Sequence, residues 1–83
     1  MAQFSPEETY TKVTGIIAEK LNIDVNTIKP QATVQELGAD SLDLVEIILK
    51  LEESFHIEIA DEDIAHLNTV QDFVDYIQRK RTK

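Results

Sequence analysis

Ser41 is the residue of this chain whose setting best suits covalent chemistry, because it follows Asp40 and opens an apolar, helix-forming stretch. A serine hydroxyl can act as a nucleophile, which requires a histidine base beside it, or as an anchor for a phosphate-linked group, which requires only exposure. The two histidines, His56 and His66, both lie beyond the helix that Ser41 begins, so no catalytic triad is indicated. The residues around Ser41 therefore do not indicate a hydrolytic enzyme.

Neither composition nor spacing predicts a metal or redox site. The chain has no cysteine, which excludes disulfides, thiolate nucleophiles and cysteine-based metal sites. His56 and His66 lie near acidic residues, but the HExxH and EF-hand spacings are missing, so no metal is expected.

The charge balance points to basic protein partners. Sixteen Asp and Glu residues face eight Lys and Arg residues, with a net charge of -8 and a pI near 4.5. Such a surface repels nucleic acids and anionic membranes. No apolar run reaches the roughly 20 residues of a membrane span, and the MAQFSPEE start resembles neither a signal peptide nor a transit sequence. We expect a single domain over residues 1–83, monomeric and cytoplasmic, whose 42% hydrophobic content is enough for folding.

The apolar periodicity predicts an all-α fold, a small four-helix bundle with three longer helices, one short helix and a long first loop. The run Ser5-Pro6-Glu7-Glu8 marks the start of a first helix over about 6–21. Gly15 in this helix is expected to pack closely against a neighbouring element. The connection over 22–39 is long, so it must pack through its own apolar residues, namely Ile23, Val25, Ile28, Val34 and Leu37.

Three further helices should follow the loop. Asp40 is expected to cap a second helix that ends near Phe55, with Asp43 favourable to its dipole. A short third helix from Asp61 should bury Ile64 and Leu67. Thr69 and Asp72 form a capping-box pair that opens the fourth helix. The basic run 79–81 is interpreted as a solvated tail matched to the helix dipole, and Thr82 and Lys83 are expected to fray.

The second predicted helix has two apolar faces. A sector about 100° wide forms the expected core stripe and contains Leu44, Ile47, Ile48, Leu51 and Phe55. Leu42, Val45 and Leu49 fall on another side, among Glu46, Glu52 and Glu53. Ten carboxylates and a single basic residue, Lys50, lie between Glu36 and Asp63. Burial of the second stripe under the loop is one explanation; a docking site for basic partners is the one that we favour.

The stretch LGADSLD at residues 37–43 resembles the signature of acyl carrier proteins, and the likeness continues through VE, LEE and FHIEI to the closing TVQDFVDYI helix. The resemblance covers nearly the whole chain. It implies that Ser41, flanked by Asp40 and Leu42, carries a 4'-phosphopantetheine arm, attached by a phosphopantetheinyl transferase. The missing cysteine fits, because acyl transfer favours a thioester and this chain must import its thiol.

The resemblance also implies a function in fatty acid biosynthesis. The growing acyl chain would be carried as a thioester and presented to basic-surfaced fatty acid synthesis and acyltransferase enzymes, through a face made of Asp43, Val45, Glu46, Leu49, Glu52 and Glu53. An acyl cavity would be lined by Leu51, Phe55, Ile59 and Ile64. Ala60 departs from the proline that is frequent in related sequences, and Ile64 and Ala65 make the third helix unusually apolar.

Three other functions remain open at this point. The chain could be a free-standing carrier for polyketide, aminoacyl or specialised lipid assembly, or an acidic adaptor that uses the Leu42, Val45 and Leu49 stripe without any prosthetic group. An intact Ser41 argues against the adaptor. A small hydrolase would need His56 or His66 as a base, and neither is placed for it.

Overall fold

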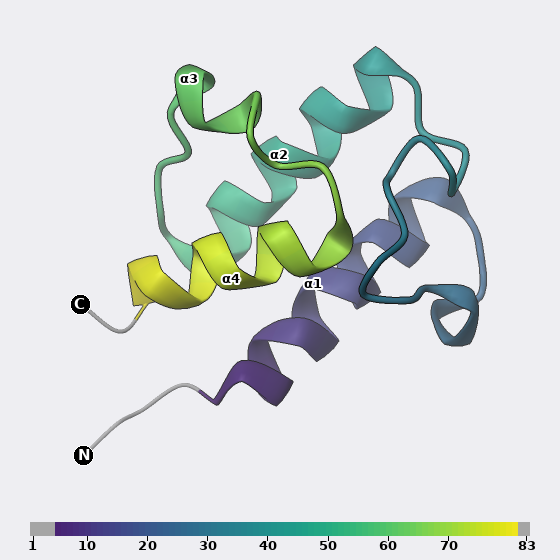
Figure 1. Ribbon diagram of the computed structural model, residues 1–83, viewed down its shortest axis with the longest axis horizontal. Helices are drawn as coiled ribbons and strands as arrows, with labels where there is room; N and C mark the ends of the chain where they lie inside the picture. The colour runs from purple at the N-terminus through teal and green to yellow at the C-terminus, as the bar shows by residue number, and fades with distance from the viewer. Residues whose placement is uncertain (1–4, 82–83) are drawn as a thin grey trace.

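Helices account for most of the computed structural model, which describes residues 5–81 (Figure 1). Their bounds are α1 Pro6–Leu21, η1 Val25–Thr27, α2 Ser41–Phe55, α3 Asp61–Ile64 and α4 Val70–Arg81, where η1 is a short 3-10 helix. The described residues form no strand beyond one isolated bridge, so the predicted all-α fold with a long first loop is confirmed. The predicted fraying of Thr82 and Lys83, and the first four residues of the MAQFSPEE start, lie outside the described residues.

The predicted start of α1 is confirmed. The Ser5 side chain accepts a hydrogen bond from the Glu8 amide at 3.1 Å, and Pro6 occupies the first helical position, where its missing N–H is not needed. Asn22 ends the helix in the left-handed conformation, with φ 58°. The expectation for Gly15 is wrong, because a Cβ at this exposed position would meet nothing within 4 Å.

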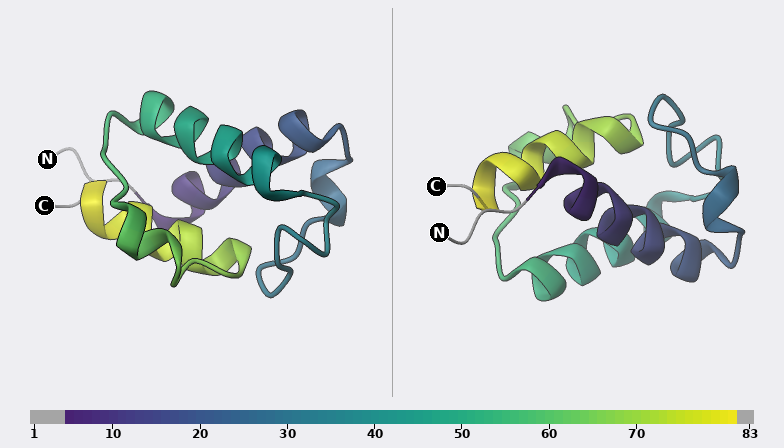
Figure 2. Two further views of the ribbon diagram at one scale, coloured as in Figure 1. Left: turned by 90° about the horizontal axis from the view of Figure 1, so that it is seen from above. Right: turned by 90° about the horizontal axis from the view of Figure 1, so that it is seen from below.

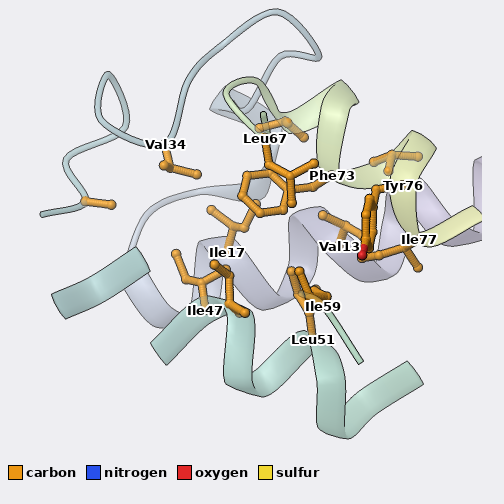
Figure 3. Close-up of a cluster of buried hydrophobic side chains, with 14 of the residues drawn as sticks. Val13, Ile17, Val34, Ile47, Leu51, Ile59, Leu67, Phe73, Tyr76 and Ile77 are labelled. Atoms are coloured by element: carbon orange, nitrogen blue, oxygen red, sulfur yellow. The ribbon is translucent and has the colours of Figure 1, made fainter. Parts of the chain in front are cut away.

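The core forms where α1 packs against both α2 and α4. Figure 2 (right) shows α1 lying between these two helices. Ile17, Ile47 and Phe73, one from each helix, are fully buried and point toward one another in Figure 3. Burial of their apolar surface at three different helices fixes the bundle.

The long loop closes one end of the bundle and is anchored to α4. Ile28 and Val34 are buried as predicted, and Ile23 and Leu37 are partly buried, whereas Val25 is 41% exposed and the prediction for it is wrong. The Val70 amide donates to the Ala32 carbonyl at 2.9 Å, and the Gln71 amide to the Pro30 carbonyl at 2.9 Å. The loop therefore satisfies amides of the first turn of α4 that a helix leaves unpaired.

The capping pair of α4 is confirmed. The Asp72 amide donates to the Thr69 hydroxyl at 3.1 Å, and the Asp72 carboxylate accepts from the Thr69 amide at 3.1 Å. Before this helix, Leu67 is buried as predicted, but Ile64 of α3 is only half-buried. The half-burial leaves part of the Ile64 side chain available at the surface of the bundle.

The basic end of α4 is not simply a solvated tail. The Arg81 guanidinium lies 4.8 Å from the centre of the Phe55 ring and donates to the Thr9 hydroxyl at 3.2 Å. A cation over an aromatic face is attracted by the ring quadrupole. Arg81 therefore joins α4 to both α1 and α2, which corrects the sequence interpretation; Arg79 and Lys80 are exposed as expected.

Candidate functional site

Ser41 is the first residue of α2, and its side chain is exposed. The turn that holds it is a reciprocal capping box. The Asp43 amide donates to Asp40 Oδ1 at 2.9 Å, and the Asp40 amide donates to Asp43 Oδ2 at 3.3 Å. The cap by Asp40 was predicted; the return contact from Asp43 was not, although an acid three residues after the cap is its usual signal. The box fixes the backbone on both sides of Ser41.

The chain reaches this turn along a constrained path. Gly38 has φ +105°, a conformation that residues with side chains rarely adopt, so a glycine is favoured there. The next residue, Ala39, is buried, and its amide donates to the Val34 carbonyl at 3.0 Å. Ser41 is thus exposed on a backbone that is held on its N-terminal side by a buried residue.

The second apolar stripe of α2 is open to solvent. Leu42 is 65% exposed, Val45 52% and Leu49 57%. The loop does not cover them, so burial within the chain is excluded as the explanation. We call these three residues the apolar docking patch, after the docking role that the sequence analysis predicts for them. It begins directly after Ser41 and runs down the helix, while the core stripe is buried where α2 packs against α1.

The carboxylates around this patch are not equivalent. Glu46 forms an ion pair with Lys20 of α1. Glu52 Oε2 accepts a hydrogen bond from the Ile59 amide at 2.8 Å and so holds the segment that follows α2. The Glu53 side chain is exposed and makes no hydrogen bond or ion pair with any other residue among 5–81. The sequence placed all three acids on one face of the helix. Nothing near Glu46 or Glu52 in the sequence indicates which more distant residue each of them contacts.

A hollow of about 180 Å³ opens beside the patch, between α2 and α3. Its lining includes Ile59 and Ile64, two of the four residues predicted for an acyl cavity. Leu51 and Phe55, the other two, do not line it. Leu51 is fully buried in the closed core, and Phe55 packs under Arg81. The remaining lining comes from Leu44, Val45, Ile48, Leu49, Glu52 and Asp61.

A side-chain hydrogen bond joins α3 to α4. The Tyr76 hydroxyl donates to Asp63 Oδ2 at 2.7 Å, and the Tyr76 ring is buried. Burial, together with this hydrogen bond, raises the pKa of Tyr76 above its ordinary value of 10.0. α3 is a single turn of four residues, and this contact joins it to α4. Sequence analysis did not identify it.

Other kinds of site find no support within residues 5–81. No three His, Cys, Asp or Glu side chains gather as a metal ion would require, over the part of the chain that the structure describes. In the same part, every helix is too short or too polar to cross a membrane.

The sequence of this chain matches a known protein family. A family profile described as a phosphopantetheine attachment site matches residues 11–77, which contain the α2 start and the hollow. Relatives are acyl carrier proteins. One from Helicobacter hepaticus is 41% identical over 75 residues, 89% of this chain and 99% of its own length. One from Bdellovibrio bacteriovorus is 46% identical over 72 residues, 86% of this chain and 92% of its own length.

Solved structures are similar over the same length. The acyl carrier protein of Enterococcus faecalis superimposes with a TM-score of 0.76 at 36% identity, over 92% of this chain and 98% of that one. The HMG-ACPI domain of the CurA module of Lyngbya majuscula gives a TM-score of 0.84 over 96% of this chain and 81% of that one. At 19% identity, the second likeness concerns the fold alone.

Proposed function

Because the chain belongs to the acyl carrier protein family, whose members carry phosphopantetheine and are carriers rather than enzymes, we propose that Ser41 holds the 4'-phosphopantetheine arm and that the chain serves fatty acid synthesis. The observation that carries the proposal is an exposed serine at the first position of α2. When bound, the arm supplies the thiol that holds an acyl group as a thioester, which this cysteine-free chain cannot provide.

The residues around Ser41 suit a phosphodiester. Its hydroxyl makes no hydrogen bond to another residue in the described part of the chain, so attachment there breaks no contact. The capping box uses the Asp40 and Asp43 amides, and the other amides of this first turn, at the electropositive end of the helix, favour a phosphate. Asp40 holds this first turn, and Leu42 places an exposed apolar side chain directly after the attachment point.

Intact mass after incubation with coenzyme A and a phosphopantetheinyl transferase tests the attachment. We expect the gain of one phosphopantetheine group, and none in Ser41→Ala. Ser54→Ala is the matched control, because Ser54 is an exposed serine of the same helix, and it should be modified fully. A mass gain that survives in Ser41→Ala would refute the assignment.

The proposed partners are enzymes with basic surfaces, which bind the apolar docking patch and the acids around it. Three large apolar side chains on one exposed stripe beside Glu53 suit a transient interface, with apolar contacts at its centre and charge at its rim. Asp43, Glu46 and Glu52 lie on the same helix and belong to the proposed face, although each also has a contact within the chain. The net charge of -8 opposes self-association, so we propose a monomeric cytoplasmic carrier with residues 1–83 as one domain.

The acyl groups loaded in cells distinguish fatty acid synthesis from its alternatives. Carrier purified from its native cells should hold fatty acyl groups of several lengths. Some should be saturated, and others should carry a keto group, a hydroxyl group or a double bond at the β-carbon. Polyketide, aminoacyl or unusual lipid groups would instead assign the chain to one of those pathways. Carrier that stays unmodified in cells with a competent transferase would support an acidic adaptor.

We further propose that the hollow beside α3 receives the first part of the acyl chain. The half-buried Ile64 and the buried Ile59 face this space, and movement of the one-turn α3 would widen it. Loading with a medium-length acyl group should shift the methyl NMR signals of Ile59 and Ile64. The Val13 methyls, which lie in the closed core, serve as the control and should move much less.

A further inference from the structure

A groove of about 480 Å³ runs along the surface where α1 meets α2. It adjoins the apolar docking patch because Leu49 belongs to both. The groove is lined by Ile16, Glu19, Lys20, Glu46, Leu49, Lys50 and Glu53. Its walls therefore combine two apolar side chains with cations and carboxylates, unlike the uniformly acidic surface that the composition suggests.

Lys20 crosses this groove to pair with Glu46. The Lys20 side chain is 38% exposed and that of Glu46 is 42% exposed, so solvent or an incoming protein can reach both groups. The hydrogen bond with Glu46 raises the pKa of Lys20 above its ordinary value of 10.5. The positive charge is thus held against a carboxylate of the docking face.

We propose that Lys20 is a specificity-determining residue that competes with the basic side chains of partner enzymes for Glu46. This inference rests on the proposed docking role of α2. A partner cation that binds Glu46 must compete with Lys20 for the carboxylate, whereas Glu53 is available without competition. Glu46 and Glu53 are the same residue type on the same helix, but a partner that binds Glu46 must also weaken its ion pair with Lys20.

The competition selects for a particular kind of partner. An exposed ion pair is weak, so replacing one lysine by another gains little. An arginine binds a carboxylate through two parallel hydrogen bonds and is less strongly hydrated than an ammonium group, so it displaces Lys20 more effectively. The face thus favours enzymes that present an arginine to Glu46 over those that present a lysine.

Binding of apo carrier variants to a phosphopantetheinyl transferase, measured as Kd at low salt, tests the idea. Lys20→Gln should bind about two to five times more tightly than the starting chain, the range expected for release of an exposed ion pair. Lys29→Gln is the matched control: it removes the same charge from an exposed lysine that forms no ion pair among residues 5–81. In a Glu46→Gln background, Lys20→Gln should change Kd no more than Lys29→Gln does.

Equal effects of Lys20→Gln and Lys29→Gln with Glu46 intact would overturn the inference, since only general charge would then matter. A second measurement is independent of docking: the Lys20 pKa, followed by NMR at Nζ, should fall in Glu46→Gln. A failed mass gain at Ser41 would instead refute the proposed function and leave this NMR result unaffected. The two failures are therefore distinguishable.

Discussion

Removal of the cap at the start of α2 tests how the turn around Ser41 is held. In Asp40→Ala, the Asp43 amide loses the carboxylate oxygen that lies 2.9 Å away. The weaker return contact, from the Asp40 amide to Asp43 at 3.3 Å, uses the backbone and can remain. The substitution thus removes one side-chain acceptor and leaves the core untouched.

The position of the cap decides the expected loss. N-cap substitutions to alanine cost about 0.5 to 2 kcal/mol, and a buried amide left unpaired lies at the upper end. This cap is exposed, so water can hydrate the Asp43 amide, and we expect a loss of about 1 kcal/mol. In a domain of this size, about 1 kcal/mol lowers Tm by about 4 to 8 °C.

Thermal unfolding and amide exchange check this result, with Asp40→Asn as the matched control. Asparagine keeps an oxygen that can accept from the Asp43 amide, so its Tm should stay close to that of the starting chain. Exchange of the Asp43 amide should quicken in Asp40→Ala, while exchange of the buried α4 amides should change only as far as the free energy of global unfolding falls. An unchanged Tm in Asp40→Ala, or an equal loss in Asp40→Asn, would show that the capping contact contributes nothing.

Three further substitutions probe stability. Phe73→Ala should lose about 3 to 5 kcal/mol, a large share of the roughly 4 to 12 kcal/mol expected for a chain of this length, and so lower the Tm strongly in thermal unfolding followed by circular dichroism. Tyr76 has a folded-state pKa raised above 10.0, so its contribution to the free energy of unfolding is present below about pH 10 and is lost as the pH rises through the folded-state pKa. Tyr76→Phe should therefore reduce the loss of stability at alkaline pH. Asp72 has a folded-state pKa lowered below 3.8 by the amides of Thr69 and Asn68, so its contribution to the free energy of unfolding is present above about pH 4 and is lost as the pH falls through the folded-state pKa. Asp72→Asn should therefore reduce the loss of stability at acid pH.

Specific outcomes would contradict these expectations. A stable, cooperative melt for Phe73→Ala near the original Tm would mean that the three-helix core in Figure 3 is not the main source of stability. An alkaline limb unchanged in Tyr76→Phe would show that another group titrates there, and the same test applies to Asp72→Asn in acid. Denaturant unfolding at fixed pH values supplies each of these curves.

The helices were predictable because their signals are local. Ser5 with Pro6, Asp40, and Thr69 with Asp72 act within one turn, and each occurs where a helix begins. The exposed stripe of α2 could also be predicted, since two apolar sectors on one helix cannot both face the same core.

The contacts that sequence analysis missed join distant parts of the chain. Nothing near Glu46 in sequence indicates Lys20 as its partner, and the same holds for Arg81 over Phe55. Val25 was expected to be buried because it is apolar, but η1 turns it outward. Residues in a loop have no fixed periodicity, so their burial depends on the path of the chain.

The backbone bonds from the first turn of α4 to the Pro30 and Ala32 carbonyls connect segments some forty residues apart in sequence. Such a staple makes the segment before α2 and the last helix a single cooperative unit, in which neither can unravel alone without exposing polar backbone groups of the other. α3 is joined to α4 through the Tyr76 side chain and not through backbone bonds of this kind. A movement of α3 that widens the neighbouring hollow would therefore leave the backbone beneath Ser41 in place.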